Sequence, residues 1–203
     1  MSLAGASTPA TPQAASGPEA GGAGPWMLAA LVVAFAAMGG SLSLSVCLHL
    51  KACPLCFYQR AFVMGLFGVL GMGVVAGVGR ADRLSLLALP LATAGLGVAL
   101  FHVSLELRDK LECPAGLFGL GTAPQQSLAA FVLLFGLLLI DAIRTPKADS
   151  GPWIALVGAV LLGALLAVAS CIANPPPPAP PTAPYAKPPD ICRPPFHAPE
   201  VSP

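Results

Sequence analysis

Charged residues are scarce in this sequence. Ten Lys or Arg and nine Asp or Glu make up 9% of the 203 residues, whereas 56% are hydrophobic. A soluble domain typically carries about 25% charged residues, because polar groups must cover its surface. This deficit excludes the soluble classes and predicts an integral membrane protein. The net charge is only +1 and no block of like charges occurs, so we expect no nucleic-acid partner.

Long apolar runs occur five times along the chain. A helix needs roughly 20 apolar residues to cross a bilayer core of about 30 Å. Backbone groups inside lipid must bond within their own segment, which favours helices over open strands. The runs therefore predict an all-α, polytopic membrane bundle with a four-helix core and a fifth transmembrane helix. The expected spans are 26–48, 61–78, 84–105, 127–143 and 153–173.

Proline and small residues dominate the two ends of the chain. Residues 1–25 are rich in Ala, Gly, Ser, Thr and Pro, and we expect a disordered tail there. Residues 174–203 contain a run of four prolines near their start, which predicts an extended, Pro-rich extracytoplasmic tail. Between the tails we place the four-helix core at 26–145 and the fifth helix at 146–173.

The six cysteines are too few for a disulfide-stapled scaffold, but their positions are informative. If the spans cross the membrane alternately, all six fall on or near one side. Lys and Arg divide four against four between the two sides, so the positive-inside rule does not decide the orientation. Thiols that pair belong in an oxidising compartment. We therefore expect this side to be periplasmic and the N-terminus cytoplasmic. The cysteines are Cys47, Cys53, Cys56, Cys113, Cys171 and Cys192.

The most informative stretch is Cys53-Pro54-Leu55-Cys56-Phe57-Tyr58-Gln59-Arg60, between the first two spans. Two cysteines three apart can close a small disulfide, and Pro54 presets the turn between them. Near the start of the second helix, the helix dipole and the cation Arg60 both favour the Cys56 thiolate over the thiol. The pattern predicts a redox-active pair. A metal site and a structural disulfide remain as alternatives; the metal site would have to be completed by His49, His102 and Cys47.

This stretch, Cys-x-x-Cys-aromatic-Tyr-x-Arg between two membrane spans, resembles the signature of the disulfide bond formation protein B (DsbB) family. A second similarity is His102-Val103-Ser104-Leu105-Glu106-Leu107 ahead of Cys113, which resembles the end of the family's third helix and its second cysteine-bearing loop. Together the two matches cover roughly residues 26–145.

The resemblance implies a quinone-dependent protein disulfide oxidoreductase in the bacterial inner membrane. Such a protein reoxidises a periplasmic, DsbA-like thioredoxin-fold dithiol oxidase and passes the electrons to a membrane quinone, ubiquinone or menaquinone. By this resemblance Cys56 is the quinone-proximal thiolate and Cys53 its exchange partner. Arg60 would contact a quinone carbonyl, and His102 would line the same pocket.

One feature departs from the family pattern. The family's second loop supplies two cysteines, but residues 106–126 contain only Cys113. We expect its partner to be Cys192, because a flexible tether of about twenty residues gives a substantial effective concentration. Cys171 is the second choice, since it lies at the end of an apolar helix where thiols are usually inert.

Two other functions stay open at this point. Electrons could run in the opposite direction, as in quinone-linked membrane reductases resembling vitamin K epoxide reductase. In a different class, Cys53, Cys56 and nearby histidines could bind copper or zinc in a membrane metal-binding module. The catalytic cysteines predicted for the first hypothesis are Cys53, Cys56, Cys113 and Cys192, with no metal.

Overall fold

The computed structural model describes residues 24–76, 81–144 and 152–197, and its regular structure there is helical. All five α-helices are long and apolar enough to span a membrane. The prediction of a helical membrane bundle is therefore confirmed. Most of the predicted N-terminal tail lies outside the described residues. The helices are α1 (Pro25–Val46), α2 (Pro54–Val75), α3 (Ala81–Leu107), α4 (Ala123–Arg144) and α5 (Pro152–Ile172), with a short 3-10 helix at Leu117–Gly119.

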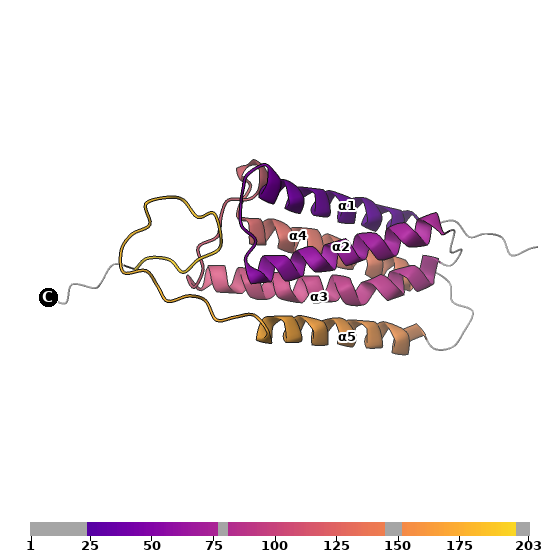
Figure 1. The fold of residues 1–203 in the computed structure, drawn as a ribbon. Coiled ribbons are helices and arrows are strands. Elements are labelled where there is room, and N and C mark those ends of the chain that lie inside the picture. Colours follow the sequence, from indigo (N-terminus) through magenta and orange to yellow (C-terminus); the bar gives the residue numbers. More distant parts are fainter. Residues whose placement is uncertain (1–23, 77–80, 145–151, 198–203) are drawn as a thin grey trace, which may run out of the picture.

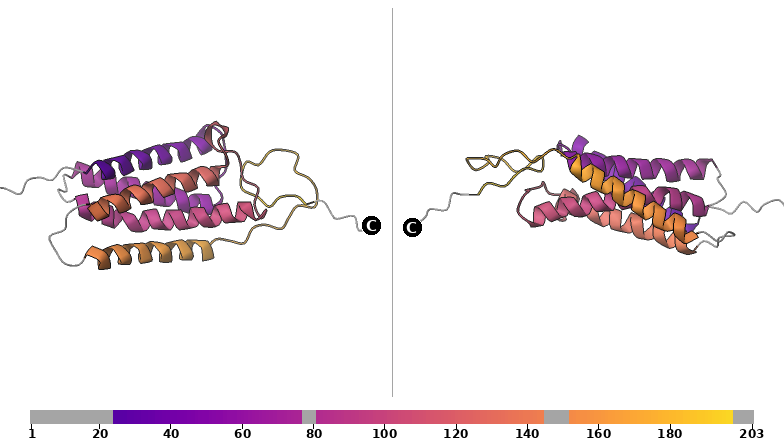
Figure 2. Two further views of the ribbon diagram at one scale, coloured as in Figure 1. Left: turned by 180° about the vertical axis from the view of Figure 1, so that it is seen from behind. Right: turned by 90° about the horizontal axis from the view of Figure 1, so that it is seen from below.

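Helices α1 to α4 form a closed ring in which each helix packs against two neighbours. α1 contacts α2 and α4, and α3 contacts the same two helices from the other side. α5 packs outside this ring, chiefly along α3 (Figures 1 and 2). The α1–α2 connection, the α3–α4 connection and the chain that follows α5 all lie at one end of the bundle (Figure 1). Because the cysteines lie in or next to these segments, this end gathers the thiol chemistry of the protein.

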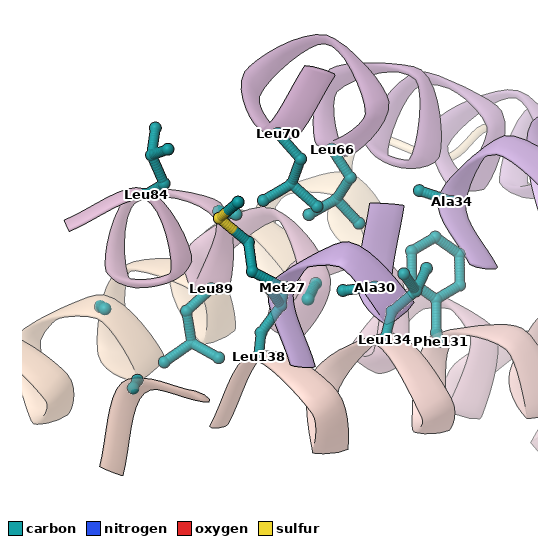
Figure 3. Close-up of a cluster of buried hydrophobic side chains, with 14 of the residues drawn as sticks. Met27, Ala30, Ala34, Leu66, Leu70, Leu84, Leu89, Phe131, Leu134 and Leu138 are labelled. Atoms are coloured by element: carbon teal, nitrogen blue, oxygen red, sulfur yellow. The ribbon is translucent and has the colours of Figure 1, made fainter. Parts of the chain in front are cut away.

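The core of the ring is built from interlocking apolar side chains. Met27 and Ala30 of α1 face Leu134 and Leu138 of α4 (Figure 3), and all four are at most 1% exposed. Small residues let the helices approach where lipid supplies little hydrophobic drive. At Gly95 of α3, a Cβ atom would collide with the Phe131 ring of α4.

Helices α2 and α4 begin well before the apolar runs predict, by seven and four residues. α2 starts at Pro54 instead of residue 61, because Cys53 acts as its N-cap: the Cys53 sulfur accepts a hydrogen bond from the Cys56 amide. α4 starts at Ala123 instead of residue 127, with the Thr122 hydroxyl accepting from the backbone N–H of Gln125 at 3.5 Å. The first turns of both helices contain polar side chains, so a search for apolar runs did not include them. As a result, Cys56 and Arg60 lie within the first two turns of α2.

Candidate functional site

Four side chains converge at the cysteine end of the bundle. The sulfurs of Cys53, Cys56 and Cys192 and a ring nitrogen of His102 all lie within 4.8 Å of one another. Cys53 and Cys56 come from the start of α2, His102 from the last turns of α3, and Cys192 from the chain after α5. The fold thus brings together residues that are up to 139 positions apart in the sequence, the separation between residues 53 and 192.

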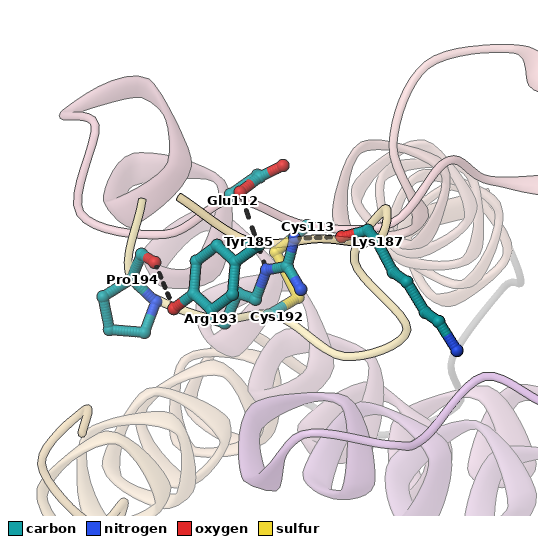
Figure 4. Close-up of polar contacts among 7 residues, drawn as sticks. All are labelled: Glu112, Cys113, Tyr185, Lys187, Cys192, Arg193 and Pro194. Atoms are coloured by element: carbon teal, nitrogen blue, oxygen red, sulfur yellow. Dashed lines mark hydrogen bonds and ion pairs between the residues drawn. A yellow bond between two sulfur atoms is a disulfide. The ribbon is translucent and has the colours of Figure 1, made fainter. Parts of the chain in front are cut away.

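Cys192 forms a disulfide with Cys113. The neighbouring residues Glu112 and Arg193 exchange two backbone hydrogen bonds of 2.7 and 3.0 Å, which form an isolated antiparallel bridge. In such a pair the next residues along are opposite each other and close, and the Cα atoms of Cys113 and Cys192 are 4.1 Å apart. Figure 4 shows this disulfide beside Glu112 and Arg193. Cys171, the second choice from the sequence, keeps a free thiol on α5.

The chain after α5 folds back onto the bundle instead of remaining an extended tether. Lys51 holds it through a backbone hydrogen bond from its N–H to the Asp190 carbonyl, 2.8 Å, and through a 3.0 Å ion pair between the side chains. This hydrogen-bonded ion pair lowers the pKa of the Asp190 carboxyl. Lys51 stands two residues before Cys53, and Asp190 stands two residues before Cys192. The contact therefore keeps the two cysteine pairs side by side.

Arg193 organises the loop that carries Cys192. Its guanidinium lies over the Tyr185 ring, 3.6 Å from the centroid, and donates to the Lys187 carbonyl at 2.8 Å (Figure 4). The same group lies 3.7 Å from a Glu112 carboxylate oxygen. The Tyr185 hydroxyl in turn donates to the Pro194 carbonyl at 3.0 Å. The contacts of Arg193 and Tyr185 thus help to give this proline-rich segment a defined shape.

The Cys53 and Cys56 sulfurs lie 2.7 Å apart as free thiols. The backbone N–H of Cys56 donates to the Cys53 sulfur at 3.2 Å, and a His102 ring nitrogen lies 3.8 Å from that sulfur. The hydrogen bond with the Cys56 side chain, followed by the effect of His102, lowers the pKa of Cys53 to about 5 despite its burial. The sequence favoured Cys56 as the thiolate. In this geometry the hydrogen bonds of the reduced pair favour the anion on Cys53.

His102 is fully buried between the two cysteine pairs. Its Nε2 atom lies 3.8 Å from the Cys53 sulfur and 3.6 Å from the Cys113 sulfur. On the other side of the ring, Nδ1 is 3.5 Å from the side-chain amide nitrogen of Gln59. The sequence placed His102 in one pocket with Arg60. In the structure it stands behind Cys53, among the sulfurs, and is not part of the pocket wall described next.

A cavity of about 180 Å³ opens beside Cys56 between α1, α2 and α4. Its wall combines apolar side chains with the polar groups of Gln59 and Arg60. Arg60 is anchored on α1: Nε and Nη2 donate to Ser41 at 3.0 Å each, and Nη2 also donates to Ser45 at 2.7 Å. Within the described part of the chain, Nη1 makes no hydrogen bond. The arrangement offers a fixed cation to a flat, mostly apolar molecule next to a thiol.

Gln59 is a site residue that the sequence reasoning missed. Its side chain is only 5% exposed, and it touches both the cavity and His102. A signal was present in the sequence: Gln59 follows Cys56 by three residues, which places both on one face of a helix. A polar side chain on the same face as Cys56, near the start of an apolar helix, indicates a residue that contacts the thiol site.

A bundle of membrane-spanning helices that holds two cysteine pairs within reach of one another defines a class, the multi-pass membrane thiol–disulfide oxidoreductases. The comparison with known families agrees with this class. The model of the family "Disulfide bond formation protein DsbB" matches residues 24–132, more than half of the chain. The chain belongs to this family.

Similar proteins carry names from the same family. A "Probable disulfide formation protein" of Chlamydia trachomatis serovar D is 33% identical over 119 residues, which cover 52% of this chain and 85% of that protein. A "Probable disulfide formation protein C 2" of Bacillus anthracis is 29% identical over 130 residues, 58% of this chain and 91% of that protein. A "Disulfide bond formation protein B" of Burkholderia pseudomallei is 33% identical over 84 residues, 40% and 49% of the two chains. No solved structure matches.

The family match ends within α4. α5 and the docked segment with Cys192 therefore lie outside the matched range. The part of the site made by α1 to α3, including the Cys53 pair, Arg60 and His102, lies inside it.

Proposed function

We propose that this protein reoxidises a periplasmic, DsbA-like thioredoxin-fold dithiol oxidase and passes the electrons to a membrane quinone. It would act in the bacterial inner membrane, with the cysteine end periplasmic and the N-terminus cytoplasmic. The observation that carries the proposal is the convergence of the two cysteine pairs beside a cavity that Arg60 lines. Family membership supports disulfide formation as the overall activity.

The first step involves the Cys113–Cys192 disulfide. A thiolate of the reduced partner attacks the Cys113 sulfur, forms a mixed disulfide and releases Cys192 as a thiolate. The partner's second thiolate then attacks the partner sulfur of that mixed disulfide, and Cys113 leaves. This leaves the partner oxidised and Cys113 as a thiol. Two electrons have moved from the partner to the Cys113–Cys192 pair.

The second step transfers those electrons to the inner pair. The Cys192 thiolate attacks Cys53 of a closed Cys53–Cys56 disulfide, and Cys56 leaves as the thiolate. Cys113 then attacks the Cys192 sulfur, which restores the Cys113–Cys192 bond and leaves Cys53 reduced. The distance of less than 4.8 Å between the Cys53 and Cys192 sulfurs supports this exchange. The observed arrangement, with Cys113–Cys192 closed and Cys53 and Cys56 as free thiols, corresponds to its end point.

The third step closes the inner pair. Formation of the Cys53–Cys56 bond releases two electrons and two protons. The cavity beside Cys56 fits a quinone head group, because its wall is largely apolar and includes both the Cys56 side chain and the Arg60 guanidinium. A quinone bound there would supply the two-electron acceptor. Arg60 and Gln59 would orient it, and His102, within 3.8 Å of the Cys53 sulfur, is placed to take the proton from that thiol.

The test uses the purified full-length protein in lipid nanodiscs with a soluble quinone and a reduced thioredoxin-fold dithiol protein. We expect catalytic oxidation of the dithiol with equivalent loss of quinone. Cys56→Ser should abolish it, whereas Cys171→Ser should leave it intact. Oxidation that survives Cys56→Ser refutes the proposal. Net transfer in the other direction, from quinol to an oxidised partner, would instead identify a reductase.

A further inference from the structure

We infer that Cys53, Cys56, Cys192 and His102 form a zinc-binding site when both cysteine pairs are reduced. The inference concerns the cysteines of the proposed function and requires only that both pairs can be reduced. Three thiolates and one imidazole are a common ligand set of tetrahedral zinc sites in proteins. The sequence offered His49, His102 and Cys47 to complete such a set. Only His102 of these three lies in the cluster; Cys47 and His49 are exposed and stand outside it. The structure supplies Cys192 instead.

The distances between the donor atoms agree with this geometry. Bond lengths of about 2.3 Å to sulfur and about 2.0 Å to nitrogen place tetrahedral ligand atoms about 3.6 to 3.8 Å apart. The Cys53 sulfur and the His102 nitrogen are 3.8 Å apart, and all four donor atoms lie within 4.8 Å of one another. The Cys53 and Cys56 sulfurs, at 2.7 Å, are too close for two ligands of one zinc ion. They would separate by about 1 Å, which a small side-chain rotation at Cys56 provides.

The surroundings suit a bound cation. Cys53 and His102 are buried, while Cys56 and Cys192 line the cavity and give an access route from outside the bundle. His102 would bind through Nε2, the atom that faces the sulfurs. A metal-bound imidazole needs an acceptor for its other N–H. The Gln59 amide lies 3.5 Å from Nδ1, and a half-turn of this amide presents its oxygen to that proton.

Zinc binding would stop the redox cycle, and it would require both cysteine pairs to be reduced. The ion stays Zn²⁺, each protonated thiol gives its proton to water as its sulfur binds, and Cys113 remains a free thiol. Zinc holds Cys192 and Cys53, the nucleophile and the target of the exchange, so electron transfer between the pairs ceases. Closing Cys53–Cys56 removes two ligands and closing Cys113–Cys192 removes one. Zinc would therefore bind the protein only when electrons have accumulated on both pairs.

The experiment uses the full-length protein in nanodiscs, without quinone or partner. One sample is reduced with a phosphine under nitrogen and another is fully oxidised. Both receive Zn²⁺, are desalted, and are analysed for metal by mass spectrometry. Co²⁺ serves as a second probe, because its visible spectrum reports tetrahedral thiolate coordination. We expect one metal ion per reduced chain, less than one tenth per oxidised chain, and intense cobalt absorption only in the reduced sample.

Variants identify the ligands. Cys192→Ser should weaken zinc binding at least tenfold and reduce the cobalt–thiolate absorption by about one third, since one of three sulfurs is lost. Cys171→Ser and Cys47→Ser are the matched controls and should bind like the unmodified chain. Absence of metal from the reduced protein, or unchanged affinity in Cys192→Ser, overturns the inference. Dithiol oxidation by metal-free protein is measured separately, so failure of the redox proposal is distinguishable from failure of the zinc site.

Discussion

Removing the Arg193 guanidinium should make the Cys113–Cys192 disulfide easier to reduce. The backbone bridge between Glu112 and Arg193 does not need the side chain, so in Arg193→Ala the disulfide should still form. What the variant loses is the ordering of the loop that presents Cys192. The equilibrium between the closed disulfide and the open dithiol should shift toward the dithiol.

The magnitude follows from three contacts of the guanidinium. Stacking on Tyr185, with a centroid distance of 3.6 Å, contributes about 1 kcal/mol. The hydrogen bond to the Lys187 carbonyl contributes about 1 kcal/mol. The Glu112 pair, at 3.7 Å with a carboxylate that is 44% exposed, adds a few tenths at most. The sum of about 2 kcal/mol corresponds to about a 30-fold change in the equilibrium constant, or about 40 mV for a two-electron couple.

The assay is a redox titration in glutathione buffers without quinone. The other four cysteines are replaced by serine, and the remaining thiols are counted by the gel shift of a maleimide polymer. Arg193→Ala should raise the reduction potential of the pair by about 40 mV. Arg108→Ala, an exposed arginine at the same end of the bundle whose side chain makes no hydrogen bond or ion pair within the described residues, is the control. A shift below about 10 mV, or an equal shift in the control, refutes the reasoning.

Three further predictions concern the inner pair, the cavity and the packing of the bundle. The pKa of Cys53 is lowered to about 5, so iodoacetamide should alkylate Cys53 of the reduced, chelator-treated protein almost as fast at pH 6 as at pH 8, and more slowly as the pH falls through 5. An alkylation rate that rises tenfold per pH unit from pH 6 to 8 contradicts the assigned hydrogen bonds. Arg60→Gln should raise the KM for quinone about tenfold or more, as expected for loss of a charged donor, without changing the Cys113–Cys192 titration; an unchanged KM in steady-state assays removes Arg60 from the quinone site. Gly95→Ala should destabilise the bundle by about 1–3 kcal/mol, because the added Cβ would overlap the Phe131 ring, whereas Gly136→Ala, with open space around it, should not. Equal melting temperatures of the two variants in detergent would show that α3 and α4 do not pack as described.

The membrane spans were largely readable from the amino-acid order, because bilayer thickness sets a length and lipid sets a composition. The first turns of α2 and α4 were not readable from hydropathy, although the cysteine motif indicated that the second helix starts near Cys56. Capping by Cys53 and Thr122 extends these helices through polar turns, and an apolar-run criterion ends where polar residues begin. The closeness of Cys53 and Cys56 followed directly from their spacing, since three residues around a helix start bring two side chains together.

The sequence by itself determined that this is a polytopic membrane protein with a thiol pair and a cation at the start of its second span. Only the tertiary structure decided which groups meet that pair. His102 faces the sulfurs instead of the cavity, Arg60 is fixed on α1, and the Cys192 sulfur lies within 4.8 Å of both sulfurs of the pair. The physical reason is that hydropathy and spacing are local properties of the chain. Contacts between segments separated by tens of residues depend on helix rotation and on the packing of small residues such as Gly95, and these are set by the whole bundle at once.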